Sequence, residues 1–109
     1  MTERVLQLNF RVKAGGNDYQ AAVAPLADAF AAVPGLRWKI WYQKNEAAGE
    51  AGGIYLFEDQ ASLDKFLASD LAAKVTGHPA LSDFSIKQFD VMEKETLKTR
   101  GPVGAKVAV

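Results

Sequence analysis

The alternation of apolar and polar residues predicts four β-strands. Successive side chains of a strand point to opposite faces, so apolar residues at every second position are typical of a half-buried strand. The first run shows this most clearly, with large apolar residues at positions 6, 8, 10 and 12 and polar residues at 7, 9 and 11. The expected strands are 5–12, 36–44, 54–58 and 84–91.

The second and third strands form a predicted hairpin that is rich in aromatic residues. The loop 45–52 between them is short and polar and contains glycine, as hairpin connections commonly do. Gly52 and Gly53 precede the third strand and predict a bulge or a close approach of two backbones. Five of the eleven aromatic residues lie in this hairpin: Trp38, Trp41, Tyr42, Tyr55 and Phe57. Such a density indicates either the core or a pocket for a flat apolar ligand.

Two helical segments are predicted between the strands. The first, 17–33, is rich in alanine and has an apolar stripe, and Pro25 is expected to kink or restart it. Asp59 or Ser62 can cap the second segment by accepting a hydrogen bond from its first turn. Residues 70–75 are expected to add a further helical turn or two.

The resulting order, β-α-β-β-α-β, is that of the ferredoxin-like fold. This α+β fold has a four-stranded antiparallel sheet with both helices on one face. We expect one such domain over residues 1–95 and a C-terminal arm over 96–109, with a short helical piece near 93–98.

Two helices cover only one face of the predicted sheet. The alternation assigns a mixture of large apolar and polar residues to the other face: Val5, Gln7, Asn9, Arg11, Lys39, Trp41, Tyr55, Phe57, Ser85, Lys87, Phe89 and Val91. An exposed apolar patch of several hundred Å² would be unusual on a monomer, whereas packing two sheets face to face would bury it. The pattern therefore predicts a homodimer through the open sheet face, with a monomer that has an amphipathic open face as the alternative.

Composition excludes several classes of protein. The 109 residues suit one domain, and 13 basic residues balance 13 acidic ones, so nothing favours a nucleic-acid partner. The absence of cysteine excludes disulfides and thiolate chemistry. The N-terminus does not resemble a signal peptide and no apolar run approaches the roughly 20 residues that span a bilayer, so we expect a cytoplasmic protein without a membrane partner.

The sequence gives no sign of a tightly bound cofactor. A single histidine and no cysteine cannot form a histidine-rich or thiolate metal site, so no metal ligands are predicted. The glycines at 49–53 precede a strand rather than a helix and lack the dinucleotide fingerprint. A bound flavin or nicotinamide is therefore not indicated, although free reduced flavin as a co-substrate stays open.

Three residues are candidates for catalysis. Asn9 lies in an apolar strand, where its amide could bind a phenolate or a peroxide. Tyr55 follows the glycine pair and could offer its hydroxyl to a ligand. His78 lies in a helix-ending loop and could serve as a general base or a haem ligand, because imidazole titrates near 6.5. The alternatives are that Asn9 is a partly hydrated residue facing the barrel, that Tyr55 packs in the core and that His78 is solvated.

A second group of residues is expected to bind the substrate: Trp38, Lys39, Trp41, Glu50 and Phe57. Trp38 and Trp41 are three apart on a strand and point to opposite faces, so one should pack under the helices. The other should meet a partner or a cavity. Core packing is the alternative for the tryptophans, a cation–π contact for Lys39 and plain solvation for Glu50.

Four short runs carry a resemblance to a known family. They are GLRWKIW at 35–41, EAGGIYLF at 50–57, LQLNF at 6–10 and FDV at 89–91. With these runs, residues 5 to about 95 resemble the YdhR-type putative mono-oxygenases of the dimeric α+β barrel group. The resemblance implies two ferredoxin-like subunits whose sheets press together with the helices outside.

The same resemblance indicates a function. Members of the wider group include small oxygenases that act on polycyclic aromatic metabolites, some without metal or flavin, and haem-degrading proteins. We therefore expect an oxidoreductase, a mono-oxygenase that acts on an aromatic or apolar small molecule with molecular oxygen as co-substrate. The alternatives are a non-catalytic small-molecule-binding or stress-associated barrel, and a haem-handling barrel.

Overall fold

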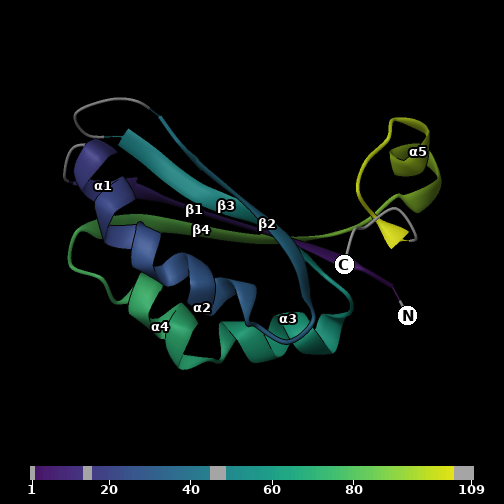
Figure 1. Cartoon of the computed structure of the whole chain (residues 1–109), viewed down its shortest axis with the longest axis horizontal. Helices are drawn as coiled ribbons and strands as arrows, with labels where there is room; N and C mark the ends of the chain where they lie inside the picture. The colour runs from purple at the N-terminus through teal and green to yellow at the C-terminus, as the bar shows by residue number, and fades with distance from the viewer. Residues whose placement is uncertain (1, 14–15, 45–48, 105–109) are drawn as a thin grey trace.

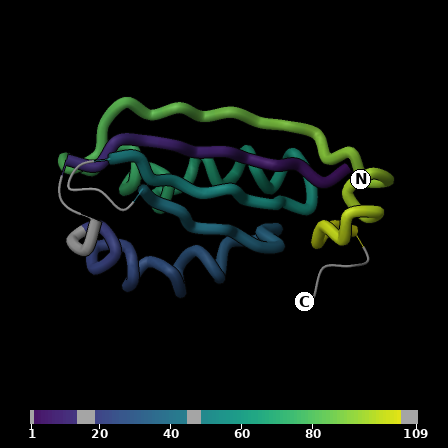
Figure 2. The backbone as a smooth tube through the Cα atoms, turned by 90° about the horizontal axis from the view of Figure 1, so that it is seen from above, coloured from purple at the N-terminus to yellow at the C-terminus, as the bar shows by residue number. Residues whose placement is uncertain are grey.

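The computed structural model describes residues 2–13, 16–44 and 49–104, except the side chains of 16–18. Its strands form one antiparallel sheet in the order β2-β3-β1-β4. The strands are β1 (Arg4–Val12), β2 (Leu36–Gln43), β3 (Gly49–Phe57) and β4 (Leu81–Asp90). Figure 2 shows them side by side in this order, and Figure 1 shows α1 to α4 on one face of the sheet. The predicted ferredoxin-like fold is confirmed.

The helices follow the capping and breaking signals of the sequence. They are α1 (Gly16–Val23), the 3₁₀ turn η1 (Ala24–Leu26), α2 (Ala27–Ala31), α3 (Gln60–Leu67) and α4 (Asp70–Thr76). Pro25 lies in the 3₁₀ turn, so the expected interruption of the first helix is confirmed. Asp59 caps α3 by accepting a hydrogen bond from the Ser62 amide at 2.8 Å, and Ser69 caps α4 in the same way.

The core lies between the sheet and these helices. Leu6, Leu8 and Phe10 of β1 are buried there together with Leu63 and Phe66 of α3. Full burial of side chains of this size contributes about 1.5–3 kcal/mol each. These residues therefore form the stable centre of the layer between sheet and helices.

Two strands are longer than the sequence predicts. β3 begins at Gly49 rather than at 54, so Gly52 and Gly53 are paired inside the sheet. A Cβ atom on Gly52 would lie 2.2 Å from the Leu8 carbonyl oxygen, which confirms the expected close backbone approach. β4 begins at Leu81 rather than at 84 and is irregular near Asp83, which has a positive φ of 55°.

The predicted open face is correct for β1 and β4 and wrong for the hairpin. Lys39, Trp41, Tyr55 and Phe57 face the helices, where Tyr55 and Phe57 belong to the core and Trp41 packs against it. The cause in β2 is a register irregularity between Leu36 and Trp38, which reverses the alternation beyond it. In β3, Tyr55 pairs with Leu6 and Phe57 with Arg4, and the Leu6 pairing places Tyr55 on the buried face. The hairpin gives the open face another set of residues: Trp38, Ile40, Tyr42, Ile54 and Leu56.

The segment after β4 folds back on the open face at one end of the sheet. It contains α5 (Glu93–Lys98), which has the predicted bounds and lies apart from the other helices (Figure 1). The Trp38 indole Nε1 donates to the Pro102 carbonyl at 2.7 Å, and the Gly104 amide donates to Glu3 Oε1 at 2.8 Å. Val103 is buried, as is Leu56 beside Trp38. This end of the open face is therefore covered by the chain itself.

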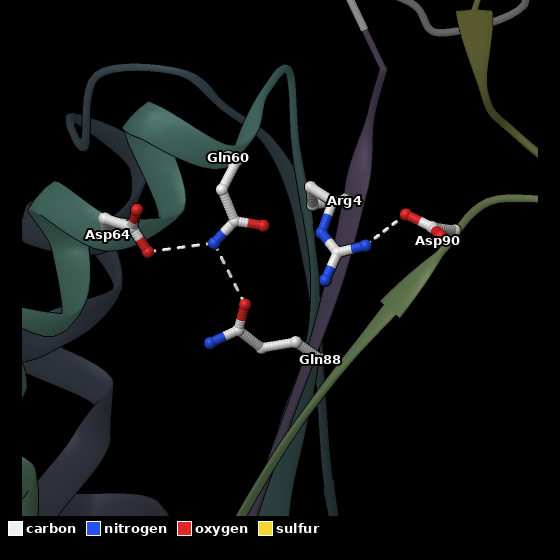
Figure 3. Close-up of polar contacts among 5 residues, drawn as sticks. All are labelled: Arg4, Gln60, Asp64, Gln88 and Asp90. Atoms are coloured by element: carbon white, nitrogen blue, oxygen red, sulfur yellow. Dashed lines mark hydrogen bonds and ion pairs between the residues drawn. The ribbon is translucent and has the colours of Figure 1, made fainter.

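Polar contacts join α3, the central strand β1 and the edge strand β4 at the same end (Figure 3). Gln60 donates to Asp64 Oδ1 at 2.8 Å and to Gln88 Oε1 of β4 at 3.0 Å. Arg4 of β1 pairs with Asp90 of β4. The Gln60–Gln88 hydrogen bond connects the helix layer to the sheet at the end away from the cavity described next.

Candidate active site

An apolar cavity lies between the sheet and the helices α1, α2 and α4. The space open to the centres of water-sized molecules is about 90 Å³. Its walls are mostly aromatic and aliphatic, with Phe10, Tyr19, Phe30, Trp41 and Tyr55 among them. A more open hollow of about 390 Å³ between α1 and β2 shares Tyr19, Val23 and Trp41 with the cavity. Small-molecule sites are commonly concave and apolar with a few polar groups, which makes this the candidate site.

The ammonium group of Lys39 is the central polar feature of the cavity. Its Nζ atom lies 3.4 Å from the ring centroid of Trp41, 3.6 Å from that of Phe30 and 4.5 Å from that of Tyr55. Gly53 makes room for the stem, because a Cβ atom there would lie 2.7 Å from Lys39 Cε. Within the described chain, Nζ has no hydrogen-bond or ion-pair partner. The lysine is therefore held by ring faces alone, with three N–H groups left for a ligand.

Burial changes the protonation of Lys39. It lowers the pKa of the amine to about 7, because an apolar surrounding disfavours the charged form. The three ring faces favour the ammonium and oppose part of this effect. At neutral pH the neutral amine, which accepts a proton, and the ammonium cation are therefore both populated.

Two tyrosines border the cavity. Tyr55 of β3 is almost completely buried, and burial raises the pKa of its hydroxyl far above the usual value. Tyr19 of α1 packs on Phe10, and burial, with a smaller contribution from Tyr42, raises its pKa to about 12. Both groups are therefore neutral hydrogen-bond donors over the physiological range.

His78 lies at the rim of the cavity, in the turn after α4. The Ala80 amide donates a hydrogen bond to Nδ1 of His78 at 3.1 Å. A neutral imidazole that accepts at Nδ1 carries its proton on Nε2. The ring therefore presents a donor, and ligation of a haem iron through Nε2 would require loss of this hydrogen bond.

Asn9 lies on the open face, on the other side of the sheet from the cavity. Its Oδ1 atom accepts a hydrogen bond from the Tyr42 hydroxyl, and a Cβ atom on Gly52 would lie 2.7 Å from it. Gly52 thus leaves the space in which the Asn9–Tyr42 pair forms. Asn9 and Tyr55 do not share a site within one chain.

The structure places the predicted binding residues in four surroundings. Trp41 packs under the helices and makes an edge contact with Phe30, with 5.1 Å between the ring centroids. Trp38 lies on the opposite face of the sheet, as the spacing predicts. Phe57 stacks on Tyr55 in the core and does not border the cavity. Glu50 pairs with Lys44 at 3.6 Å across the hairpin mouth.

The cavity residues that were absent from the predicted site include two aromatic residues and a lysine. Tyr19 comes from α1, Phe30 from α2 and Lys74 from α4. In the sequence these residues look like ordinary core or surface positions of a helix. Only the packing of α1, α2 and α4 on the sheet identifies them as cavity residues. The described residues contain no group of three acidic or histidine side chains that could hold a metal ion. None of the described helices is long and apolar enough to cross a membrane.

Comparisons with known proteins agree with this fold. Residues 5–102 match the family described as "Putative mono-oxygenase ydhR". No curated protein matches the chain. Similar solved structures include SnoaB, a cofactor-independent oxygenase from Streptomyces nogalater, with a TM-score of 0.68 and 20% identity over 84% of this chain and 94% of that one.

Two further structures have the same fold. One, from Bacillus cereus, is described as a putative antibiotic biosynthesis monooxygenase and has a TM-score of 0.60 and 12% identity, covering 84% of this chain and 95% of that one. The other is the haem degrader MhuD from Mycobacterium tuberculosis, with two haems in its active site. Its TM-score is 0.62 and its identity 17%, covering 81% of this chain and 95% of that one.

Proposed function

The chain belongs to the ydhR family of putative mono-oxygenases, and from this premise we propose that it oxidises an aromatic or apolar small molecule with molecular oxygen. The observation that carries the proposal is the cavity, whose aromatic walls enclose the Lys39 amine and border the hydroxyl-bearing rings of Tyr19 and Tyr55. Trp41 and Phe30 supply flat surfaces for a ring, and Tyr55 and His78 are the candidate hydrogen-bond donors around it.

We propose that the reaction needs no tightly bound metal or flavin. The substrate then supplies all four electrons that reduce dioxygen: an activated methylene becomes a carbonyl, one atom of oxygen enters the product, and the other leaves as water with the two hydrogens of the methylene. Loss of a proton from the substrate precedes attack on oxygen, so the protein must bind the ring, accept a proton and stabilise the anion. The fold of the cofactor-independent oxygenase SnoaB supports this choice.

The proposal predicts turnover that depends on an open cavity. We expect the purified protein to consume oxygen with one member of a panel of hydroxylated polycyclic aromatics and to place one isotopically labelled oxygen atom in the product. Replacing Ala22, an exposed residue that borders the cavity, by tryptophan should abolish turnover by obstructing the space. The matched control is Ala29→Trp, at an exposed position of α2 that does not border the cavity.

The outcome separates three functions. No oxygen uptake across the panel contradicts the mono-oxygenase, and a ligand that raises the thermal midpoint but is recovered unchanged indicates a binding protein. A Soret band on haem titration that Ala22→Trp removes and Ala29→Trp preserves indicates a haem-handling protein in its place. Equal turnover by the two tryptophan variants would show that the chemistry lies elsewhere.

We further propose that the protein is a homodimer through the open sheet face. Ile40 and Phe89 lie on this face with 54% and 47% of their surface exposed, which is unusual for large apolar residues of a monomer. Ile54 lies beside Ile40, and Val5 lies beside Phe89. A second copy of the sheet would bury this patch together with the Asn9–Tyr42 pair.

The dimer predicts a mass in solution of twice 11.8 kDa. Sedimentation at micromolar concentration measures it directly, and Phe89→Lys should shift the equilibrium to the monomer because it places a charge in the interface. Ile86→Lys is the matched control, since Ile86 is 46% exposed on the same strand but lies on the helix side of the sheet. A wild-type monomer, or equal dissociation by both variants, would contradict the proposed interface.

A further inference from the structure

The side chains around the cavity include basic residues but no carboxylate. Among the described residues that border it, Lys39, Lys74 and His78 are basic and none is acidic. Lys39 lies among the aromatic walls, whereas Lys74 and His78 are exposed residues at the rim. The whole chain has equal numbers of acidic and basic residues, so this bias belongs to the cavity and not to the composition.

Lys39 is half-buried, and its surroundings lack the oxygen partner that a cation in an apolar site normally has. Phe30 of α2, Trp41 of β2 and Tyr55 of β3 present rings to Nζ, and no carboxylate among the described residues pairs with it. Ring faces attract a cation but do not satisfy its N–H groups as an oxygen does. An anionic oxygen inside the cavity would complete the site.

We propose that the cavity binds an aromatic molecule with an anionic oxygen, a phenolate, enolate or carboxylate, and that Lys39 is the counter-ion of that oxygen. This inference rests on the proposed function for the claim that the cavity takes a small molecule, and it specifies the chemical class. When the ligand enters as a phenol or enol, its oxygen loses a proton and the Lys39 amine gains it. The O–H bond breaks, the N–H bond forms, and no further reactant is required.

The same geometry argues against a cationic ligand. An aromatic cage ordinarily recognises an ammonium group of the ligand, but here the protein's own lysine occupies the cage. A second cation would meet Lys39 inside and Lys74 at the rim. Like charges in an apolar site repel strongly, so the preference for an anion follows from both residues.

The test uses three single-ring probes that differ in one group. 4-Nitrophenol forms a yellow phenolate, 4-nitrobenzoate carries a carboxylate, and 4-nitroanisole stays neutral. We expect the protein to bind one or both anions more tightly than the anisole and to lower the apparent pKa of bound 4-nitrophenol by about 1–3 units, as an opposite charge nearby does. Which of the two anions binds more tightly identifies the oxygen that the cavity prefers.

The variant Lys39→Met tests the role of the amine at nearly constant volume. It should weaken anion binding by about 30-fold or more, the loss typical of removing one partner of a buried charge pair, and leave anisole binding within a factor of two. Lys94→Met, at an exposed position of α5, is the control and should change neither. Anion binding that Lys39→Met leaves unchanged would overturn the proposal.

The wild type alone keeps the proposal falsifiable if Lys39→Met does not fold. Binding of 4-nitroanisole as tight as that of both anions, binding of none of the three probes, or an unshifted pKa of bound 4-nitrophenol would each overturn it. These outcomes are separate from oxygen uptake. Anion binding without turnover refutes the proposed reaction and keeps the counter-ion, whereas turnover without a preference for anions does the reverse.

Discussion

Replacing Phe30 by alanine is expected to lower the free energy of unfolding by about 3 kcal/mol. Phe30 is 2% exposed and makes ring contacts with Trp41, Tyr55 and Phe66 at 5.1–6.1 Å between centroids. Removal of a buried phenylalanine side chain typically costs about 3–5 kcal/mol. We expect the lower end of this range because one side of Phe30 borders the cavity, so part of its contact surface is already empty.

Chemical denaturation with urea measures the change, and Ile86→Ala is the control. Ile86 is 46% exposed, so its truncation should change the free energy of unfolding by about 0.5 kcal/mol or less. A loss below about 1 kcal/mol for Phe30→Ala would mean that α2 does not pack on the sheet as described. The walls of the cavity would then be wrong as well.

Local signals in the sequence were sufficient for the order of the elements. Pro25 interrupts the first helix, Asp59 caps α3 and residues 93–98 form α5, all as predicted. Each of these features depends on a few neighbouring residues, because caps and breaks are decided within one or two helical turns. The element order then leaves few alternatives to the ferredoxin-like fold.

The faces of the hairpin could not be derived from alternation alone. Leu36 packs against the core, yet Trp41 at an odd spacing from it packs on the same side, because the register shifts between Leu36 and Trp38. Such a bulge moves every later side chain to the other face. Its position depends on pairing with β3, which the local sequence does not specify.

The register also explains which candidate residues meet. Lys39, Trp41, Tyr55 and His78 all border the cavity, whereas Asn9 and Trp38 lie on the open face. The sequence supplied the residue types, but their grouping required long-range pairing of β1, β2 and β3. Tyr19 and Phe30 border the cavity because of the way the helices pack over the sheet, which the local sequence does not specify.

Between pH 7 and pH 9 the wild-type protein is expected to become more stable as the pH rises. The pKa of Lys39 is about 7 in the folded chain and 10.5 in the unfolded reference, so between these values the unfolded state binds the additional proton. Stability then increases with pH, by at most about 1.4 kcal/mol per unit. We expect a total rise of about 1–3 kcal/mol over this range, since the ring faces favour the ammonium and reduce the slope.

The tyrosines set the upper limit of this experiment and lysine variants provide its controls. Burial raises the pKa values of Tyr19 and Tyr55, so above about pH 10 the folded chain binds more protons and stability falls again. Urea titrations at pH 7, 8 and 9 should show a slope that Lys39→Met removes and Lys94→Met retains. At pH 7 the Lys39→Met protein should be more stable than the wild type, because it lacks the cost of placing a charge in apolar surroundings. A wild-type stability that is constant or falls from pH 7 to 9 would show that Lys39 stays fully protonated, and the amine could then not accept a proton from a bound ligand.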